Sequence, residues 1–238
     1  YRGAGAQLHE REPVFREWFD RLASAFARHL PIDLHEAVLR AGTDAAVDPD
    51  TLALQAQPAI FTVSVALVRL LESKGLMPDV MIGHSLGEYV AAHVAGVFSF
   101  DDAVALIAAR SRLMAGLPFG AMQALPASAD EVAPWLVAGI EIAAVNGGGQ
   151  CVIAGTPAAM ARQLEHLEQA DRPVGVSLQT SRAFHTAAVE PLLASWREFV
   201  ASVERRAPTI GFVSNVTGDM ITAEQACSPD YWCEHMRR

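Results

Sequence analysis

The residues best suited to chemistry lie in the pentapeptide Gly83-His84-Ser85-Leu86-Gly87, which fits the pattern G-x-S-x-G. A short β-prone segment, 79–83, precedes it, and a helical pattern runs on from Ser85 to about Val94. In a nucleophile elbow, this strand-turn-helix context lifts the serine hydroxyl clear of the backbone at a helix N-terminus. We therefore expect Ser85 to be a nucleophile and the amide of Leu86 to point where an oxyanion forms. The alternative is a glycine-rich turn with an incidental serine, which this context disfavours.

A serine nucleophile needs a general base, and eight histidines are available. We prefer His185, which follows a predicted strand and loop and precedes a helix, a position that could face the elbow. His84 lies inside the elbow and cannot reach the neighbouring hydroxyl well, and His93 lies about two turns along the elbow helix. The others are expected to be solvated or to lie near the C-terminus: His9, His29, His35, His166 and His235. No Asp or Glu is placed as a third member, so we expect a Ser-His dyad.

Arg110 lies in the middle of an apolar helical stripe. A helix is expected from a cap at 99–102 to about Ala115, and at ~100° per residue its positions 103, 106, 107 and 114 lie within about 60° of Arg110. Arginine is almost never fully buried without a partner. The partner is either a structural carboxylate or an anionic substrate, which suits the planar, bidentate guanidinium.

The elements around these residues suggest two parts. We expect a first helix over 12–29, a loop over 42–57 and a second helix that starts at Pro58 and ends at Gly75. The middle of the chain then follows the order β-α-β-β-α-β of a ferredoxin-like unit, with its elements at 121–125, 128–137, 140–145, 150–154, 156–169 and 174–178. We interpret 121–178 as an inserted subdomain, and Gly147-Gly148-Gly149 as a hairpin turn rather than a phosphate loop. A helix over 187–203 and a strand over 210–214 follow.

Composition narrows the class of protein. The net charge of −9 argues against a nucleic-acid binder. Three cysteines without a C-x-x-C indicate neither a disulfide framework nor a cysteine zinc site, so a reducing, cytoplasmic setting fits best. No apolar run approaches ~18 residues, so we expect no membrane span. The N-terminus lacks a start methionine and a signal-peptide core.

Together the motifs resemble the acyltransferase domain of modular polyketide synthases and, more distantly, malonyl-CoA:acyl-carrier-protein transacylases. The resemblance covers nearly the whole chain. Besides the elbow and its continuation to Ala92, it rests on the segments 12–16, 57–61, 109–114, 144–147, 183–185, 213–218 and 230–232.

This resemblance implies an α/β fold, with a hydrolase-like parallel-sheet core at 1–120 and 179–238 and a ferredoxin-like α+β subdomain at 121–178. It implies that Ser85 carries the acyl group, that His185 is the base, oriented by a backbone carbonyl, and that Arg110 binds the free carboxylate of a malonyl group. Gln57 and His84 would line the pocket with Leu86 and Phe184. A malonyl unit would pass from coenzyme A to the phosphopantetheine thiol of an acyl carrier protein, with no metal or cofactor, beside neighbouring synthase domains.

Two departures from the family pattern stand out. The malonyl-selective motif that ends at the base reads His-Ala-Phe-His, whereas this chain has Arg182-Ala183-Phe184-His185, so the effect of Arg182 on substrate choice is open. The chain also resembles a domain clipped at both ends. Without the N-terminal Gly-Gln-Gly-Ser-Gln strand and its oxyanion donor, we expect poor transfer and aggregation when residues 1–238 are expressed alone.

Two other classes are weighed against this one. An α/β-hydrolase, such as an esterase or thioesterase, would place an acid after the serine and its histidine late in the chain. The inserted β-α-β-β-α-β unit and Arg110 argue against it, and a release assay with water or a carrier thiol as acceptor would separate the two. A non-catalytic docking module is disfavoured by the presence of both Ser85 and His185.

Overall fold

The computed structural model describes residues 3–40 and 48–238. The chain forms two compact units, one made of residues 1–113 with 195–235 and the other of residues 114–194 with 236–238. Residues 42–47 of the expected first loop lie outside the described residues. The boundaries expected from the sequence, at 121 and 178, remain predictions.

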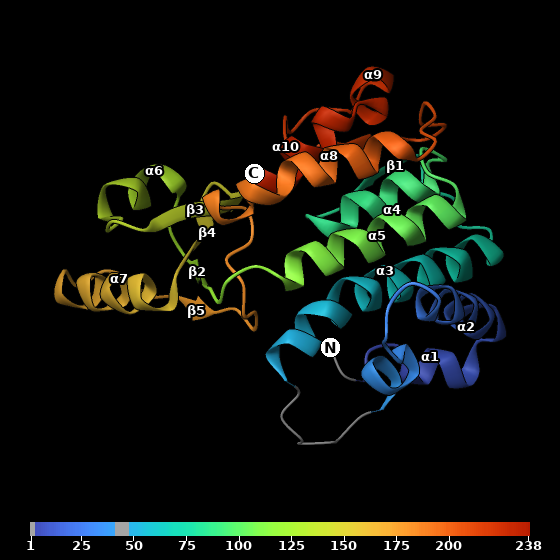
Figure 1. Cartoon of the computed structure of the whole chain (residues 1–238), viewed down its shortest axis with the longest axis horizontal. Coiled ribbons are helices and arrows are strands. Elements are labelled where there is room, and N and C mark those ends of the chain that lie inside the picture. The colour runs from blue at the N-terminus through green and yellow to red at the C-terminus, as the bar shows by residue number, and fades with distance from the viewer. Residues whose placement is uncertain (1–2, 41–47) are drawn as a thin grey trace. The chain divides into compact units, whose positions relative to one another are not determined.

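Helices dominate the first unit. The helix α1 (Ala6–Arg11) and α2 (Pro13–Ala27) are followed by a π-helical turn, η1 (His35–Leu39). The long α3 (Pro49–Ser73) packs between α2 and α4 (Leu86–Val94), as Figure 1 shows. Phe15, Phe19 and Phe26 of α2 and Phe61 of α3 are fully buried. The apolar stripe of the expected first helix is therefore the face that α2 turns to the core.

The expected start of the second helix at Pro58 is wrong. The helix begins at Pro49, where the Asp48 carboxylate accepts the Thr51 N–H at 2.9 Å, and Pro58 lies in the helix interior. Proline has no N–H, so it leaves the carbonyl four residues earlier, that of Leu54, without its helical partner. The buried Ser111 hydroxyl donates to this carbonyl at 2.6 Å. A neighbouring helix thus provides the hydrogen-bond donor that the Leu54 carbonyl lacks. Helix propensities within α3 cannot reveal this donor.

By length and composition α3 is suited to crossing a membrane, since an 18-residue window has a mean hydropathy of 1.5. The core helix of a globular protein has the same features. This window is 39% buried, and α3 packs against α2 and α4.

A parallel sheet lies beside α4 in the first unit and confirms the expected α/β class. The strand β1 (Val80–Ile82) pairs in parallel with β6 (Gly211–Val213), with Ile82 opposite Val213. The outer side chains of β1 are exposed, Val80 by 54% and Ile82 by 77%. Beside them, an apolar hollow of ≈ 260 Å³ is lined by Val68, Leu71, Leu76, Met77, Pro78 and Met81.

Four further helices lie wholly or mostly in the first unit: α5 (Phe100–Ala115), α8 (Leu193–Ser202), α9 (Ala223–Cys227) and α10 (Pro229–Arg237). The last two were not expected from the sequence. Trp196 of α8 and Trp232 of α10 are fully buried, and the Trp232 ring lies 4.6 Å from that of Tyr89 on α4. Aromatic packing therefore ties the C-terminal helices to the helix that follows the elbow.

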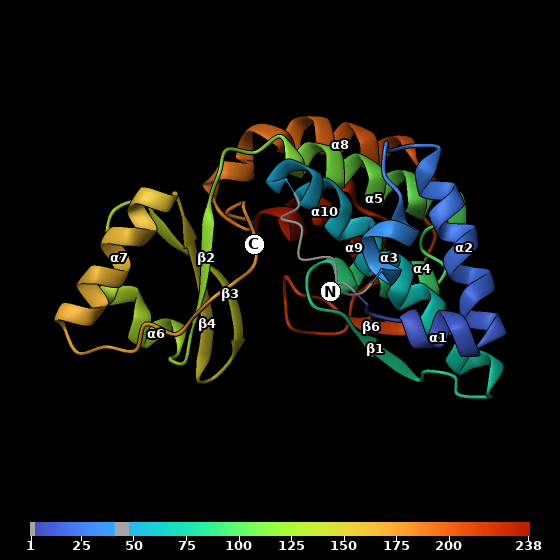
Figure 2. The same cartoon turned by 90° about the horizontal axis from the view of Figure 1, so that it is seen from below.

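The second unit has the expected ferredoxin-like topology. Its antiparallel sheet has the order β3-β4-β2-β5, with the strands at Ala121–Leu125 (β2), Ile140–Gly147 (β3), Gln150–Gly155 (β4) and Val176–Ser177 (β5). The helices α6 (Ala129–Val132) and α7 (Pro157–Gln169) lie on the same side of the sheet (Figure 2). The expected capping box of Ser128 and Glu131 starts α6, and Gly147 pairs with Gln150 around the expected hairpin turn. Short 3₁₀ turns, η2 (Ala133–Trp135) and η3 (Ala187–Leu192), follow α6 and precede α8.

Candidate active site

The elbow holds Ser85 in a strained backbone conformation. Its φ is 48° and its ψ −111°, immediately before α4. Such a conformation costs of order 1–3 kcal/mol in a residue other than glycine, and it persists only where the surroundings enforce it. A Cβ added at Gly83 would lie 2.0 Å from the carbonyl carbon of Gly87, so that position requires glycine. At Gly87 a Cβ would meet nothing within 4 Å, so of the two glycines that flank the serine in the motif only Gly83 is required by crowding.

Asn215 fixes this turn from the neighbouring strand. Its Oδ1 accepts the Ser85 N–H at 2.7 Å, and its Nδ2 donates to the Gly83 carbonyl at 2.7 Å. The contact follows from the topology, because β1 and β6 are parallel and in register. Residues that come just after two such strands leave the sheet at the same edge. Asn215 was not expected to be a site residue, although it lies in the segment 213–218 on which the family resemblance rests.

A buried carboxylate anchors Asn215 in turn. Glu88, on the first turn of α4, is 0% exposed, and its Oε2 accepts the Asn215 backbone N–H at 2.7 Å. Its Oε1 accepts the hydroxyl of Tyr231, which also lies 2.7 Å from Ser214 Oγ. Burial raises the pKa of Tyr231, and the hydrogen bond to Glu88 raises it further. The hydroxyl therefore stays protonated and can donate. The buried His235 approaches the same carboxylate, with Nε2 3.3 Å from Oε2.

The sequence carried a signal for Glu88 that was not used. Four apolar residues, 89–92, follow it on the elbow helix. A carboxylate in such a setting needs partners, by the same rule that singled out Arg110. Its partners lie 127 and 143 residues further along the chain, so only the fold could identify them.

Arg110 is buried among neutral partners. The residue is 3% exposed, its guanidinium donates to Gln57 Oε1, and its Cζ lies 5.4 Å from the centre of the Tyr89 ring. Its Nε is buried without a hydrogen-bond partner, and no carboxylate among the described residues pairs with it. Burial lowers the pKa of this guanidinium. Tyr89 lies one turn after Ser85, on the same face of α4.

The segment Arg182-Ala183-Phe184-His185 lies in the second unit. The Arg182 guanidinium donates to the Ala115 carbonyl at 2.9 Å and lies 4.6 Å from the centre of the Phe119 ring. Because Ala115 ends α5, the cation caps that helix at the end where a positive charge is favourable. Phe184 packs against the buried face formed by Met122, Ala143, Val152, Ala154 and Ala183.

His185 also has a strained backbone, with a φ of 58°, and it is 9% exposed. Apart from Asp171, Ser85 and His185 are the only non-glycine residues of the described chain with positive φ. Strained backbones cluster at active sites. The structure thus groups Ser85, Leu86, His84, Gln57 and Arg110 in the first unit, and Arg182, Phe184 and His185 in the second.

The parallel sheet, the elbow at Ser85 and the ferredoxin-like unit agree with the acyltransferase fold that the sequence resembles. The whole chain, residues 1–238, matches the family described as "Acyl transferase domain", and the protein belongs to that family. It is 45% identical over 238 residues to the phenolphthiocerol synthesis polyketide synthase type I Pks15/1 of Mycobacterium marinum, covering 99% of this chain and 11% of that protein. It is 43% identical over 237 residues to the mycoketide-CoA synthase of Mycobacterium tuberculosis, covering 99% of this chain and 6% of that one.

Solved structures agree with this assignment. The acyltransferase domain of SpnD, in complex with 2-(pent-4-yn-1-yl)malonyl, superposes with a TM-score of 0.88 at 36% identity, over 100% of this chain and 56% of that one. The malonyl CoA-acyl carrier protein transacylase of Coxiella burnetii superposes with a TM-score of 0.84 at 25% identity, over 100% and 76%. The chain therefore spans a small part of its curated relatives and about half to three quarters of these solved domains.

Proposed function

We propose that this acyltransferase domain moves a malonyl extender unit from coenzyme A to the phosphopantetheine thiol of an acyl carrier protein through an acyl-Ser85 intermediate. The strained, glycine-dependent elbow and its support by Asn215 are what a serine nucleophile needs. The relatives named as polyketide synthases and the malonyl transacylase neighbour support the substrate class.

The reaction has two half-reactions, the acylation of Ser85 and the transfer of the acyl group to the carrier thiol. His185 accepts the Ser85 proton as Oγ attacks the malonyl thioester carbon, and the tetrahedral intermediate expels the coenzyme A thiolate, which takes up a proton from His185. The thiol of the carrier then attacks the Ser85 ester, and its proton returns to Ser85 by way of His185. The amide of Leu86, at the N-terminus of α4, stabilises the oxyanion in both half-reactions.

The observation that carries the malonyl assignment is the environment of Arg110. The contacts of this buried cation are an amide oxygen and an aromatic ring, and no carboxylate of residues 3–40 and 48–238 neutralises its charge. An incoming carboxylate would supply that charge through two parallel hydrogen bonds. Gln57 holds the guanidinium from α3 in a fixed orientation. We propose that His84 and Phe184 line the acyl pocket and that Arg182, by holding the end of α5, positions the helix that carries Arg110.

The test compares Arg110→Ala on malonyl and acetyl thioesters. A charge-assisted contact of roughly 1.5–3 kcal/mol predicts a roughly ten- to hundredfold loss of malonyl transfer and a smaller effect on acetyl, which has no carboxylate. Arg112→Ala is the matched control, because this arginine lies on the same helix but is exposed. The assay is run on residues 1–238 and, if the gene encodes further residues on either side, on a form extended by those residues. Equal losses for both acyl groups would make Arg110 structural, and release to water in place of a carrier thiol would favour a thioesterase.

The setting of the domain is part of the proposal. Because the chain matches only 11% and 6% of two large synthases, we propose that it works beside other synthase domains, in the cytoplasm, with the acyl carrier protein as its partner. The chemistry above uses only side chains, the backbone amide of Leu86 and the two thiols, so we propose that it needs no metal or redox cofactor.

A further inference from the structure

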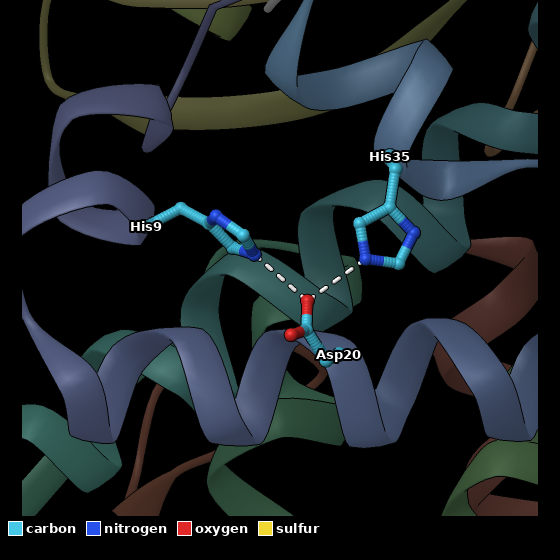
Figure 3. A group of neighbouring side chains, drawn as sticks. All are labelled: His9, Asp20 and His35. Carbon is cyan, nitrogen blue, oxygen red and sulfur yellow. Dashed lines mark hydrogen bonds and ion pairs between the residues drawn. The ribbon is translucent and has the colours of Figure 1, made fainter.

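Two histidines and one aspartate converge on a single point in the first unit, on elements that the proposed reaction does not use. His9 of α1 and His35 of η1 each direct Nε2 toward Oδ1 of Asp20 on α2, at 2.7 and 2.8 Å (Figure 3). From the sequence, both histidines were expected to be solvated side chains. They are partly exposed, and both face the same carboxylate from separate segments of the chain.

The arrangement has the donor set and the spacing of a transition-metal site. The three potential ligand atoms lie within 4.8 Å of one another. Around a tetrahedral zinc ion with bonds of about 2.0–2.1 Å, neighbouring ligand atoms lie roughly 3.3 Å apart. Each N···O contact would therefore need to open by only about half an ångström. Two imidazole nitrogens favour zinc over magnesium or calcium, which prefer oxygen ligands.

The surroundings hold the two imidazoles in place. Each ring packs edge-on against Phe19, with centroids 5.4 Å apart in both pairs, and Phe19 is fully buried. The two imidazole planes are inclined at 87° to each other. Asp33 lies behind His35, with Oδ1 3.9 Å from Nδ1, the side on which a second carboxylate orients many metal-bound histidines.

The site is open to solvent, and Asp20 offers a carboxylate oxygen as the third ligand atom. The side chains of His9, Asp20 and His35 are 22%, 46% and 47% exposed. An ion can therefore enter from solvent and keep water in its remaining coordination position.

We propose that His9, Asp20 and His35 bind one zinc ion that fastens α1 and η1 to α2. The helix α1 has no buried residue of its own, so it gains little from the hydrophobic core. A metal bond to its neighbours would add the stability that burial does not provide. The ion has a structural role, apart from the transfer chemistry at Ser85.

The test measures zinc binding to the tag-free chain after dialysis against EDTA. Equilibrium dialysis at pH 7.4 should find one zinc ion per chain that is absent from the double variant His9→Gln/His35→Gln. Loss of an outer-shell partner already costs roughly 10–100-fold in metal affinity, so Asp20→Asn, which removes a direct ligand, should cost at least tenfold. His166→Gln, an exposed histidine on α7, should bind as the unchanged chain does.

Two further readouts separate a built site from adventitious binding. The melting temperature should rise with zinc but not with magnesium, and binding should weaken at pH 5.5 because protons compete for imidazole nitrogens. Far-UV circular dichroism of the metal-free variants checks that they remain folded. Zinc retained at equal affinity in the double variant would assign it to other groups, such as the three cysteines, and overturn the proposal. A chain that binds no zinc would overturn it as well.

Discussion

Replacing Asn215 with alanine removes the two side-chain hydrogen bonds that clamp the elbow, to the Ser85 N–H and the Gly83 carbonyl. Each contributes about 0.5–1.5 kcal/mol net, so the variant should lose roughly 1–3 kcal/mol of unfolding free energy. This loss matches the order of magnitude of the backbone strain at Ser85. Without the clamp, Ser85 is expected to relax toward an unstrained conformation that displaces its hydroxyl.

The displacement should lower the rate of malonyl loading in a chain that remains folded. A misplacement of about 1 Å can lower a rate by roughly a hundredfold, whereas a loss of roughly 1–3 kcal/mol leaves most molecules folded. The assay pairs urea denaturation with the rate of malonyl loading at saturating malonyl-CoA. Thr209→Val is the matched control, because it removes a 2.9 Å hydrogen bond to Ala95 at the other end of α4. If Asn215→Ala loads malonyl as fast as Thr209→Val, the clamp does not position the nucleophile.

Three other predictions follow from the geometry. Ser111→Ala leaves the Leu54 carbonyl unsatisfied and should lower the free energy of unfolding, measured with denaturant, by roughly 1–3 kcal/mol. In a Pro58→Ala background, where residue 58 regains its N–H, the loss should be much smaller. Equal losses in both backgrounds would contradict the explanation of the α3 break. Burial opposes ionisation of Asp20, but hydrogen bonds from His9 and His35 outweigh it and lower the pKa of this carboxyl. In metal-free protein, the Asp20 carboxylate should therefore stabilise the fold above about pH 4, and this stabilisation should be lost as the pH falls further. A stability difference between the unchanged chain and Asp20→Asn that does not shrink between pH 6 and pH 3 would refute the linkage. Malonyl should be preferred over methylmalonyl by about 1–3 kcal/mol if Phe184 crowds the 2-methyl group, which a competition assay checks; dominant methylmalonyl loading would count against it.

Patterns within a few residues of sequence were enough to predict several helices and strands. The strand at 121–125, the capping box at Ser128 and the helix over 157–169 follow from alternation, capping and periodicity within a few residues. The start of α3 was missed because Pro58 is a helix-start signal in isolation. The carbonyl that it leaves without a helical partner, that of Leu54, is satisfied by Ser111, 57 residues after Leu54 in the chain. Only the tertiary fold provides that partner.

The same distinction applies to the site. Ser85 and Arg110 could be singled out locally, one by its glycine-flanked turn and the other by a charge in an apolar stripe. Asn215 could not, because its contact with Ser85, 130 residues earlier in the chain, depends on the pairing of β1 with β6. The approach of His9 and His35 to Asp20 likewise depends on how three helical segments pack, which periodicity does not specify.

The acyl-Ser85 intermediate is tested most directly by intact-protein mass spectrometry after incubation with malonyl-CoA. We expect one malonyl adduct per chain, mapped by peptide digestion to Ser85 and absent from Ser85→Ala. An acyl carrier protein that bears a free phosphopantetheine thiol should discharge this adduct. Ser73→Ala, which removes an unrelated helix-terminal hydroxyl, should keep the adduct. An adduct that persists in Ser85→Ala would contradict the central claim.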